Sequence, residues 1–202
     1  SITYGGAKQT FTCPAPVAIV ADIDIIAAAP KHMTAAGYAD LAAKVPAGAE
    51  WIIADFVNSE PIQDDAWHIL QDFLDDFLAD PEGVAAGEPK AIADLFEGLT
   101  LSGFAMQAAR SSRPASCCDH LFSHIMDMTG HRYNGELQSH GYQVAIGTLT
   151  MCAVFDELFK LDLTQLAAQR KGILAHFRSR GKIDICEQAG VFLSHILALL
   201  GY

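Results

Sequence analysis

The segment KAIADLFEGLTLSGFAMQAA, residues Lys90–Ala109, decides the fold class expected of this chain. Its first half has the polar and apolar faces of an amphipathic helix, and its second half, LTLSGFAMQAA, is small and apolar on all sides. The segment Gly141–Lys160 is also apolar almost all round. Helices of this kind are buried among other helices, so the two segments predict a mainly α, multi-helix domain with a central layer.

Helical spacing of apolar residues continues through most of the chain. A helix is expected over Thr34–Lys44, a break or a kink at Pro46 and Gly48, and a second apolar segment over Ala49–Val57. The segment Ile62–Asp80 places apolar residues on one face and aspartates on the other, which predicts one helix with a solvated acidic face.

The first thirty residues are the only part expected to form strands. The runs at Thr10–Cys13 and Pro16–Ile26 contain many β-branched residues, which favour strands. One or two strands do not form a stable sheet by themselves. We therefore expect residues 1–30 to be the trailing strands of a domain whose beginning is absent, and residues 31–202 to form a helical domain.

The composition of the chain bounds its class and its partners. The chain has 202 residues, of which 51% are hydrophobic, and a formal net charge of −11. This length provides the core of one large domain. The acidic balance argues against a nucleic-acid partner, because phosphate groups are bound mainly by Lys and Arg. Small molecules are the expected ligands.

The apolar stretches of the chain do not predict a membrane span. Pro16–Ala21 and Val191–Tyr202 are too short or too polar, and no basic-then-apolar leader opens the sequence. We therefore expect a cytoplasmic protein with no membrane partner. The five cysteines form no CxxC pair, so reduced thiols are expected at Cys13, Cys117, Cys118, Cys152 and Cys186.

A group of histidines marks the candidate site. His120 and His124 are four residues apart in SSRPASCCDHLFSHIMDM, and on a helix this spacing lets both reach one point. Paired imidazoles suit a divalent metal, although an isolated pair is more often two ordinary hydrogen-bonded histidines. His140 strengthens the metal hypothesis, because Gly141 follows it and permits a close approach of backbone and ligand.

Asp40 is the candidate carboxylate. Its neighbours Ala39 and Leu41 are apolar, and a buried, unpaired carboxylate is costly without a cation. Lys44 follows four residues later, so a plain helix ion pair between Asp40 and Lys44 is the alternative.

Several segments, taken in order, resemble sn-glycerol-1-phosphate dehydrogenases, in the group that also holds glycerol dehydrogenase, the iron-containing alcohol dehydrogenases and 3-dehydroquinate synthase. They are PVAIVADIDIIAAAP, MTAAGYADLAAKVPAGAEWIIAD, LFEGLTLSGFAMQAARSSRPAS, DHLFSH and SHGYQVAIGT. The resemblance runs from about Val17 to Leu149, and its SRPAS…H…SH run followed by SHG…IGT is typical of the glycerol-1-phosphate branch.

The resemblance implies a two-domain enzyme with the active site between its domains. The first thirty residues would then belong to a nucleotide-binding domain, and the rest would be the metal- and substrate-binding domain of a dehydroquinate synthase-like fold. The resemblance also implies Asp40, His120 and His140 as metal ligands. His124 would lie close to the substrate and relay a proton.

The implied metal is Zn²⁺, with Ni²⁺ as a close rival. Iron-containing relatives place a fourth ligand, a histidine, one turn after the aspartate, where this chain has Lys44, and a protonated lysine does not ligate. Three protein ligands with open positions suit a catalytic, Zn²⁺-like ion. The chain departs from its relatives at Cys117 and Cys118, interpreted as packing residues or neighbours of the ligands, and at Asp119, where relatives have Glu.

The expected function is the interconversion of dihydroxyacetone phosphate and sn-glycerol 1-phosphate with NAD or NADP as cofactor. The substrate would be a phosphorylated polyol or ketone, and a homo-oligomeric state is left open. The alternatives are a related glycerol, polyol or alcohol dehydrogenase, and a metal-binding helical fragment with no activity by itself. Because the glycine-rich phosphate loop of the relatives is not recognised in the sequence, we expect negligible dehydrogenase activity from residues 1–202 alone.

Overall fold

The computed structural model describes residues 2–4, 7–9, 11, 16–56, 59–158 and 160. The chain divides into two compact units, Ser1–Met151 and Cys152–Tyr202, and the core and the site described below belong to the first.

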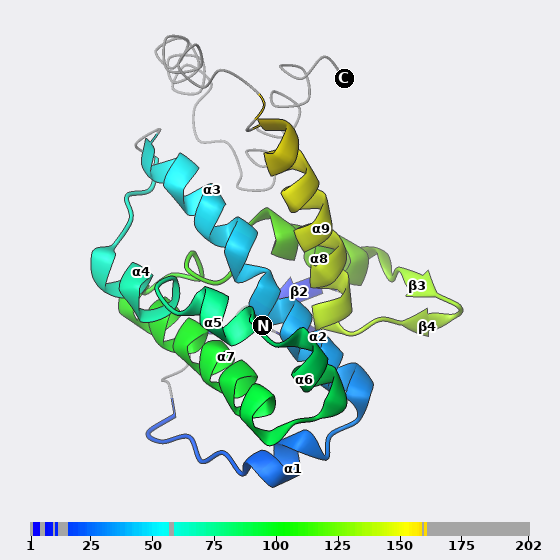
Figure 1. The fold of residues 1–202 in the computed structure, drawn as a ribbon. Helices are drawn as coiled ribbons and strands as arrows, with labels where there is room; N and C mark the ends of the chain where they lie inside the picture. The colour runs from blue at the N-terminus through cyan, green and yellow to red at the C-terminus, as the bar shows by residue number, and fades with distance from the viewer. Residues whose placement is uncertain are drawn as a thin grey trace. The chain divides into compact units, whose positions relative to one another are not determined.

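The mainly α class is confirmed by the described residues (Figure 1). The helices are α1 (Ile23–Ala27), α2 (Lys31–Ala42), α3 (Lys44–Phe56), α4 (Asp64–Leu70), α5 (Leu74–Leu78), α6 (Pro81–Ala86), α7 (Pro89–Ala109), α8 (Cys118–Thr129) and α9 (His140–Leu158). Two antiparallel hairpins pair β1 (Ile2–Tyr4) with β2 (Ala7–Gln9), and β3 (Arg132–Tyr133) with β4 (Glu136–Leu137). No helix among these residues is long and apolar enough to cross a bilayer.

The strand predicted over Pro16–Ile26 is wrong. The first part of this run is exposed and irregular, and α1 begins within it because the Asp22 carboxylate accepts from the backbone N–H groups of the next turn. Ile23 and Ile26, three residues apart, pack together against the apolar core. This helical spacing prevails over the β propensity of the branched side chains. Most of the run predicted at Thr10–Cys13 lies outside the described residues.

Two predicted helix boundaries are also wrong. The break expected at Pro46 and Gly48 is absent, since α3 runs through both residues. Pro46 lies in the first turn, where its missing N–H has no intrahelical partner to lose. The single helix expected over Ile62–Asp80 is divided at residues 71–73 into α4 and α5, where Gln71 turns its amide inward to donate to the Lys44 carbonyl at 3.2 Å.

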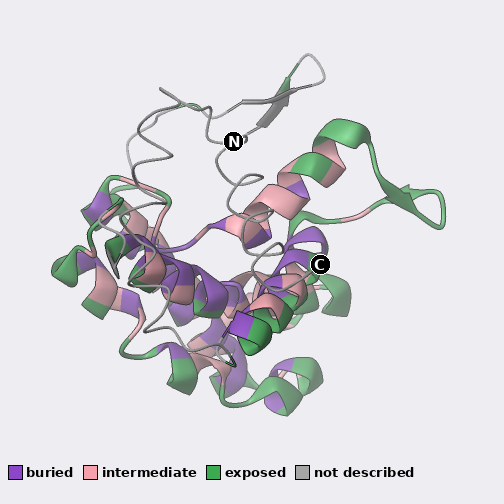
Figure 2. Ribbon diagram, turned by 90° about the horizontal axis from the view of Figure 1, so that it is seen from above, coloured by how far each residue is buried: buried purple, intermediate pink, exposed green. Residues whose placement is uncertain are grey.

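The apolar core lies around α7, which packs against α1, α2, α4, α5 and α6. The buried residues of this core are Leu41, Leu70, Leu74, Val84, Ala91, Ile92, Leu95 and Ala105. Figure 2 shows buried positions concentrated where these helices face one another. The helix predicted over Lys90–Ala109 is therefore confirmed as the central element of the core, although Phe104 reaches solvent.

The helices α8 and α9 are joined by the β3–β4 hairpin, which is exposed and projects from the helices (Figures 1 and 2). Its turn is Asn134-Gly135, and both residues have positive φ, as a two-residue hairpin turn requires. This hairpin corrects the expectation that strands are confined to the first thirty residues. The helix predicted from Gly141 is confirmed, but its burial on all sides is wrong, since Ile146 and Leu149 are exposed.

Candidate metal centre

Three helices bring together Asp40, His120 and His140, which all lie in the first unit. Asp40 lies in the last turn of α2, His120 in the first turn of α8, and His140 is the first residue of α9. Gly141 permits this meeting, because a Cβ atom at that position would lie 2.1 Å from the backbone oxygen of Ala36 on α2. The close approach at this glycine is between α9 and the helix that carries Asp40, and the approach of a ligand expected there stays a prediction.

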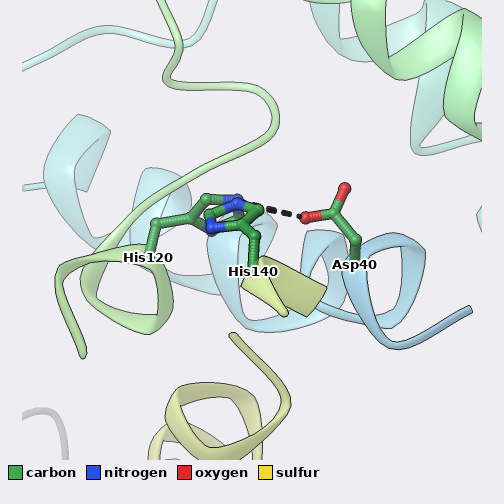
Figure 3. A group of neighbouring side chains, drawn as sticks. All are labelled: Asp40, His120 and His140. Carbon is green, nitrogen blue, oxygen red and sulfur yellow. Dashed lines mark ion pairs between the residues drawn. The ribbon is translucent and has the colours of Figure 1, made fainter. Parts of the chain in front are cut away.

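The ligating atoms of the three side chains converge on one point. The Nε2 atoms of His120 and His140 lie 3.4 and 3.8 Å from Oδ1 of Asp40. One nitrogen or oxygen of each residue lies within 4.8 Å of the others. Figure 3 shows both imidazole rings directed at the same carboxylate oxygen. The His140 side chain is 45% exposed, whereas the His120 side chain is 12% exposed, so the group opens to solvent on the His140 side.

Asp119 determines which nitrogen of His120 faces Asp40. Its fully buried carboxylate lies 2.5 Å from Nδ1 of His120 and also accepts from the backbone N–H of Cys117 at 3.0 Å. An ionised carboxylate accepts only, so Nδ1 of His120 carries the proton. In the neutral ring, Nε2 then presents its lone pair to Asp40.

The donor set fits a divalent metal. A nitrogen lone pair opposed to a carboxylate oxygen is unfavourable unless a cation or a proton lies between them. Two imidazole nitrogens and one carboxylate oxygen are ligands that Zn²⁺ accepts, and three protein ligands leave coordination positions open. The geometry therefore fits the expected ligand set of Asp40, His120 and His140.

The alternative partner of Asp40, Lys44, is also in contact with it. The Lys44 side chain is 2% exposed, and its Nζ donates to Oδ2 of Asp40 at 3.0 Å. The ion pair and the histidine contacts therefore use different oxygens of one carboxylate. Lys44 engages Oδ2, which leaves Oδ1 to face His120 and His140.

Electrostatics also favour a cation at this position. Burial raises the pKa of Asp40, but the hydrogen bond with His120 and the charge of Lys44 lower it by more, so the carboxyl stays well below its usual range. Burial lowers the pKa of His120, but its hydrogen bonds with Asp119 and Asp40 raise it above the ordinary value. A proton on His120 thus stabilises the site in the absence of metal, and a metal would compete with this proton.

The two adjacent cysteines contact α3, where Sγ of Cys117 lies 3.9 Å from the Ala47 carbonyl oxygen. The Arg113 guanidinium donates to Sγ of Cys117 at 2.8 Å, and the backbone N–H of Cys118 donates to Oε2 of Glu50 at 3.2 Å. Burial and the nearby Glu50 raise the pKa of Cys118 to about 12, and burial raises that of Cys117 further. Thiols held neutral in this way are poor metal ligands at neutral pH.

His124 lies one turn after His120 on α8 and is partly exposed, and it is not one of the three converging residues. Sequence reasoning missed the residues that orient the histidines, namely Asp119 for His120 and Ser123 for His140, whose Nδ1 lies 2.8 Å from the Ser123 hydroxyl. The acidic residue directly before His120 was the available signal for Asp119. No comparable signal marked Ser123, because its partner His140 lies on another helix.

Comparison with known proteins identifies a set of relatives, although no protein-family model matches the chain. A protein of Bacillus licheniformis is 32% identical over 165 residues, which are 82% of this chain and 41% of that protein. A protein of Halalkalibacterium halodurans is 33% identical over 74% of this chain, and one of Pyrococcus horikoshii is 35% identical over 71%. All three are named glycerol-1-phosphate dehydrogenase (NAD(P)+). The chain spans 38 to 41% of the length of these three relatives.

Proposed function

Because this chain is related to a part of the glycerol-1-phosphate dehydrogenases, we propose that it is the metal-binding part of an NAD(P)-dependent oxidoreductase that interconverts dihydroxyacetone phosphate and sn-glycerol 1-phosphate. The observation that carries the proposal is the convergence of Asp40, His120 and His140 from three helices. The likeness to named dehydrogenases over most of the chain supports the reaction class.

The proposal includes a fold and its division. Residues 31–202 are assigned to the helical metal- and substrate-binding domain of a dehydroquinate synthase-like fold. Residues 1–30 are assigned to the end of a nucleotide-binding domain. The polypeptide would act in the cytoplasm on a small phosphorylated polyol or ketone, without a nucleic-acid or membrane partner, as a monomer or a homo-oligomer.

The ligand set supports Zn²⁺ as the metal, with Ni²⁺ as the second candidate. When bound, such an ion polarises a substrate oxygen as a Lewis acid. Asp40 and the two imidazoles would hold it through one oxygen and two nitrogens. Lys44 restrains the other Asp40 oxygen at 3.0 Å, which favours a one-oxygen contact to the metal and leaves positions open for substrate.

His124 is proposed as the residue that moves the substrate proton. It follows His120 by one helical turn and is partly exposed. General acid–base groups contribute on the order of 10²–10⁴ in rate. This proposed role is distinct from metal retention, which is assigned to Asp40, His120 and His140.

Metal binding is tested by titrating the 202-residue chain with Zn²⁺ and with Ni²⁺ against a competing chelator, followed by elemental analysis. We expect one equivalent in the wild type and its loss in His120→Ala, His140→Ala and Asp40→Asn. His32→Ala is the matched control, because His32 is exposed on α2, the helix that carries Asp40. Stoichiometric metal in His140→Ala, or its loss in Cys117→Ala/Cys118→Ala, would overturn the ligand set. Iron found at full occupancy in the purified chain before titration would overturn the preference for Zn²⁺ over iron, which rests on Lys44.

The reaction is tested in a chimera that joins the cofactor-binding part of the Bacillus licheniformis relative to this chain. We expect NAD(P)H-dependent reduction of dihydroxyacetone phosphate by the chimera and negligible reduction by residues 1–202 alone. In the chimera, His124→Asn should lower turnover by about 10²–10⁴-fold with metal retained. Preference for unphosphorylated glycerol would favour a polyol dehydrogenase. A folded chimera that binds metal without redox activity would favour a metal-binding module.

A further inference from the structure

A chain of hydrogen bonds runs along the contact between α8 and α9 and ends at His140. Nε2 of Gln143 donates to Oδ1 of Asp127 at 2.9 Å, and the Ser123 hydroxyl lies 2.7 Å from Oε1 of Gln143. The same hydroxyl lies 2.8 Å from Nδ1 of His140. Ser123 is fully buried and Gln143 is 2% exposed, so water does not substitute for these partners.

The direction of this chain follows from the chemistry of its first member. A carboxylate accepts hydrogen bonds and does not donate them, so Gln143 must turn its NH₂ group toward Asp127. Its carbonyl oxygen then faces Ser123, whose single hydroxyl proton is donated to it. The remaining contact of the Ser123 oxygen is with Nδ1 of His140, and the oxygen can only accept there.

We propose that Asp127, Gln143 and Ser123 form a positioning relay that holds His140 in its Nδ1–H tautomer, with the Nε2 lone pair directed at Asp40. This inference rests on the proposed metal site and assigns residues that orient one of its ligands. The two histidines then reach the same tautomer by separate means. His120 is set by direct contact with Asp119, and His140 is set from Asp127 through two neutral side chains.

The relay predicts that loss of the Gln143 amide reverses the tautomer of His140, which a purely structural role of Gln143 does not predict. Without the Gln143 carbonyl, the Ser123 hydroxyl is released from its acceptor and donates to Nδ1 of His140. This bond selects the opposite tautomer, in which Nε2 carries the proton and cannot ligate. Gln143→Leu should therefore weaken Zn²⁺ binding by about 10- to 100-fold, the range usual for residues that orient metal-bound histidines, because it changes the bond that the Ser123 hydroxyl makes with His140.

Removing the hydroxyl as well should restore part of the affinity. In Ser123→Ala/Gln143→Leu the hydroxyl that would donate to Nδ1 is gone, so it no longer holds His140 in the Nε2–H tautomer. The double variant is thus expected to bind Zn²⁺ more tightly than Gln143→Leu alone. Thr148→Val is the matched control, because it removes a buried hydroxyl of α9 that donates to the Val144 carbonyl at 3.0 Å and lies outside the relay.

The experiment combines two measurements on the full 202-residue chain. The ¹⁵N spectrum of labelled histidine, recorded after chelator treatment above pH 8, reports the tautomer of His140 without any metal, and a Zn²⁺ titration then gives the affinity of each variant. We expect the Nδ1–H form in the wild type and in Thr148→Val, and the Nε2–H form in Gln143→Leu. Gln143→Met, which also lacks the amide, serves if the leucine variant does not fold.

An Nε2–H tautomer in the wild type overturns the relay, with no variant needed. Retention of the Nδ1–H form and of wild-type affinity in Gln143→Leu or Gln143→Met overturns it as well, as does a double variant that binds more weakly than Gln143→Leu. A wild-type chain that binds no Zn²⁺ or Ni²⁺ rejects the proposed metal site instead. The tautomer still decides the relay in that case, so the two failures are distinguishable.

Discussion

The helices α7 and α8 differ in what they bury. The buried residues of α7 are Ala91, Ile92, Leu95, Gly98, Ser102, Ala105 and Ala109, which are apolar or small. The buried residues of α8 are Asp119 and Ser123, which are both polar. Apolar burial stabilises a fold in proportion to the area removed from water, whereas a buried polar group is costly unless it is hydrogen-bonded. The two helices therefore serve different purposes, α7 the stability of the fold and α8 the orientation of side chains.

The hydrogen bonds of α8 support this reading of its buried residues. Asp119 contacts His120 and the Cys117 backbone, and Ser123 contacts His140 and Gln143. Each buried polar residue thus touches one of the two histidines of the candidate centre. Substitutions in α7 should change the free energy of unfolding, and substitutions of these α8 residues should change metal affinity more than stability.

The largest expected effect is on stability and belongs to α7. Ile92 is 1% exposed in the apolar core, so Ile92→Ala should lower the free energy of unfolding by about 2–5 kcal/mol through lost burial and a residual cavity. The Zn²⁺ affinity of the folded fraction should stay at the wild-type value. Denaturant unfolding and a Zn²⁺ titration below the transition measure both quantities. A loss of affinity matching the loss of stability would remove the contrast between the two helices.

The next effect concerns the glycine that brings α9 against α2. A Cβ atom at Gly141 would lie 2.1 Å from the Ala36 carbonyl oxygen, and rigid backbone cannot yield as a flexible side chain does. Gly141→Ala should cost about 1–3 kcal/mol by overpacking and should also weaken Zn²⁺ binding, because His140 is displaced from Asp40. Gly141→Ala is thus expected to lower both the free energy of unfolding and the Zn²⁺ affinity.

Gly103→Ala is the matched control for this prediction. Gly103 lies in the middle of α7, and an added Cβ atom there meets nothing within 4 Å. Alanine in an open helical position should raise the free energy of unfolding by up to about 1 kcal/mol and leave metal affinity unchanged. Equal behaviour of the two variants in denaturant would mean that α9 and α2 are not in direct contact at Gly141.

A smaller effect is expected at Asp119. Its two oxygens accept from two donors, the Cys117 N–H and the ring of His120. Asparagine offers only one acceptor, so Asp119→Asn leaves one donor facing an NH₂ group in either orientation. We expect Zn²⁺ affinity to fall by about 10- to 100-fold. Asp94→Asn, which removes a carboxylate paired with the exposed Lys90 on α7, should leave affinity unchanged, and a comparable loss there would refute a specific role for Asp119.

Much of the fold was predictable from the sequence because helical spacing is a local signal. The segment around α7 repeats its buried positions every three or four residues, and these positions are apolar or small. The wrong predictions of secondary structure have physical causes that the spacing of apolar residues does not reveal. Pro46 is compatible with a helix only because it lies in the first turn, and α1 replaces a predicted strand because Asp22 caps it. The β3–β4 hairpin depends on the Asn134-Gly135 turn, a short signal within an otherwise polar stretch.

The candidate site was predictable for a different reason. Resemblance implied Asp40, His120 and His140 as ligands, and the helices place these residues together. Spacing within one helix links His120 only to His124. The side chains that converge with His120 are Asp40 on α2 and His140 on α9, and no local sequence pattern relates these three helices. The orienting residues escaped prediction because a buried serine or glutamine reads as an ordinary small or polar residue until its partner on another helix is known. The role of His124 stays a prediction.

The smallest expected effect is the pH dependence that α8 confers through His120. Burial lowers the pKa of His120 and the hydrogen bonds with Asp119 and Asp40 raise it by more, so its folded pKa lies above the ordinary value of about 6.5. A group of this kind stabilises the fold fully below its unfolded pKa and loses that contribution as pH rises through its folded pKa. In chelator, the free energy of unfolding of the wild type relative to His120→Gln should therefore decrease as pH rises from about 6. With excess Zn²⁺ the same difference should increase with pH, because the metal requires the deprotonated ring. Denaturant unfolding of both proteins across this range, with and without Zn²⁺, measures the two slopes, and equal slopes would show that proton and metal do not compete for His120.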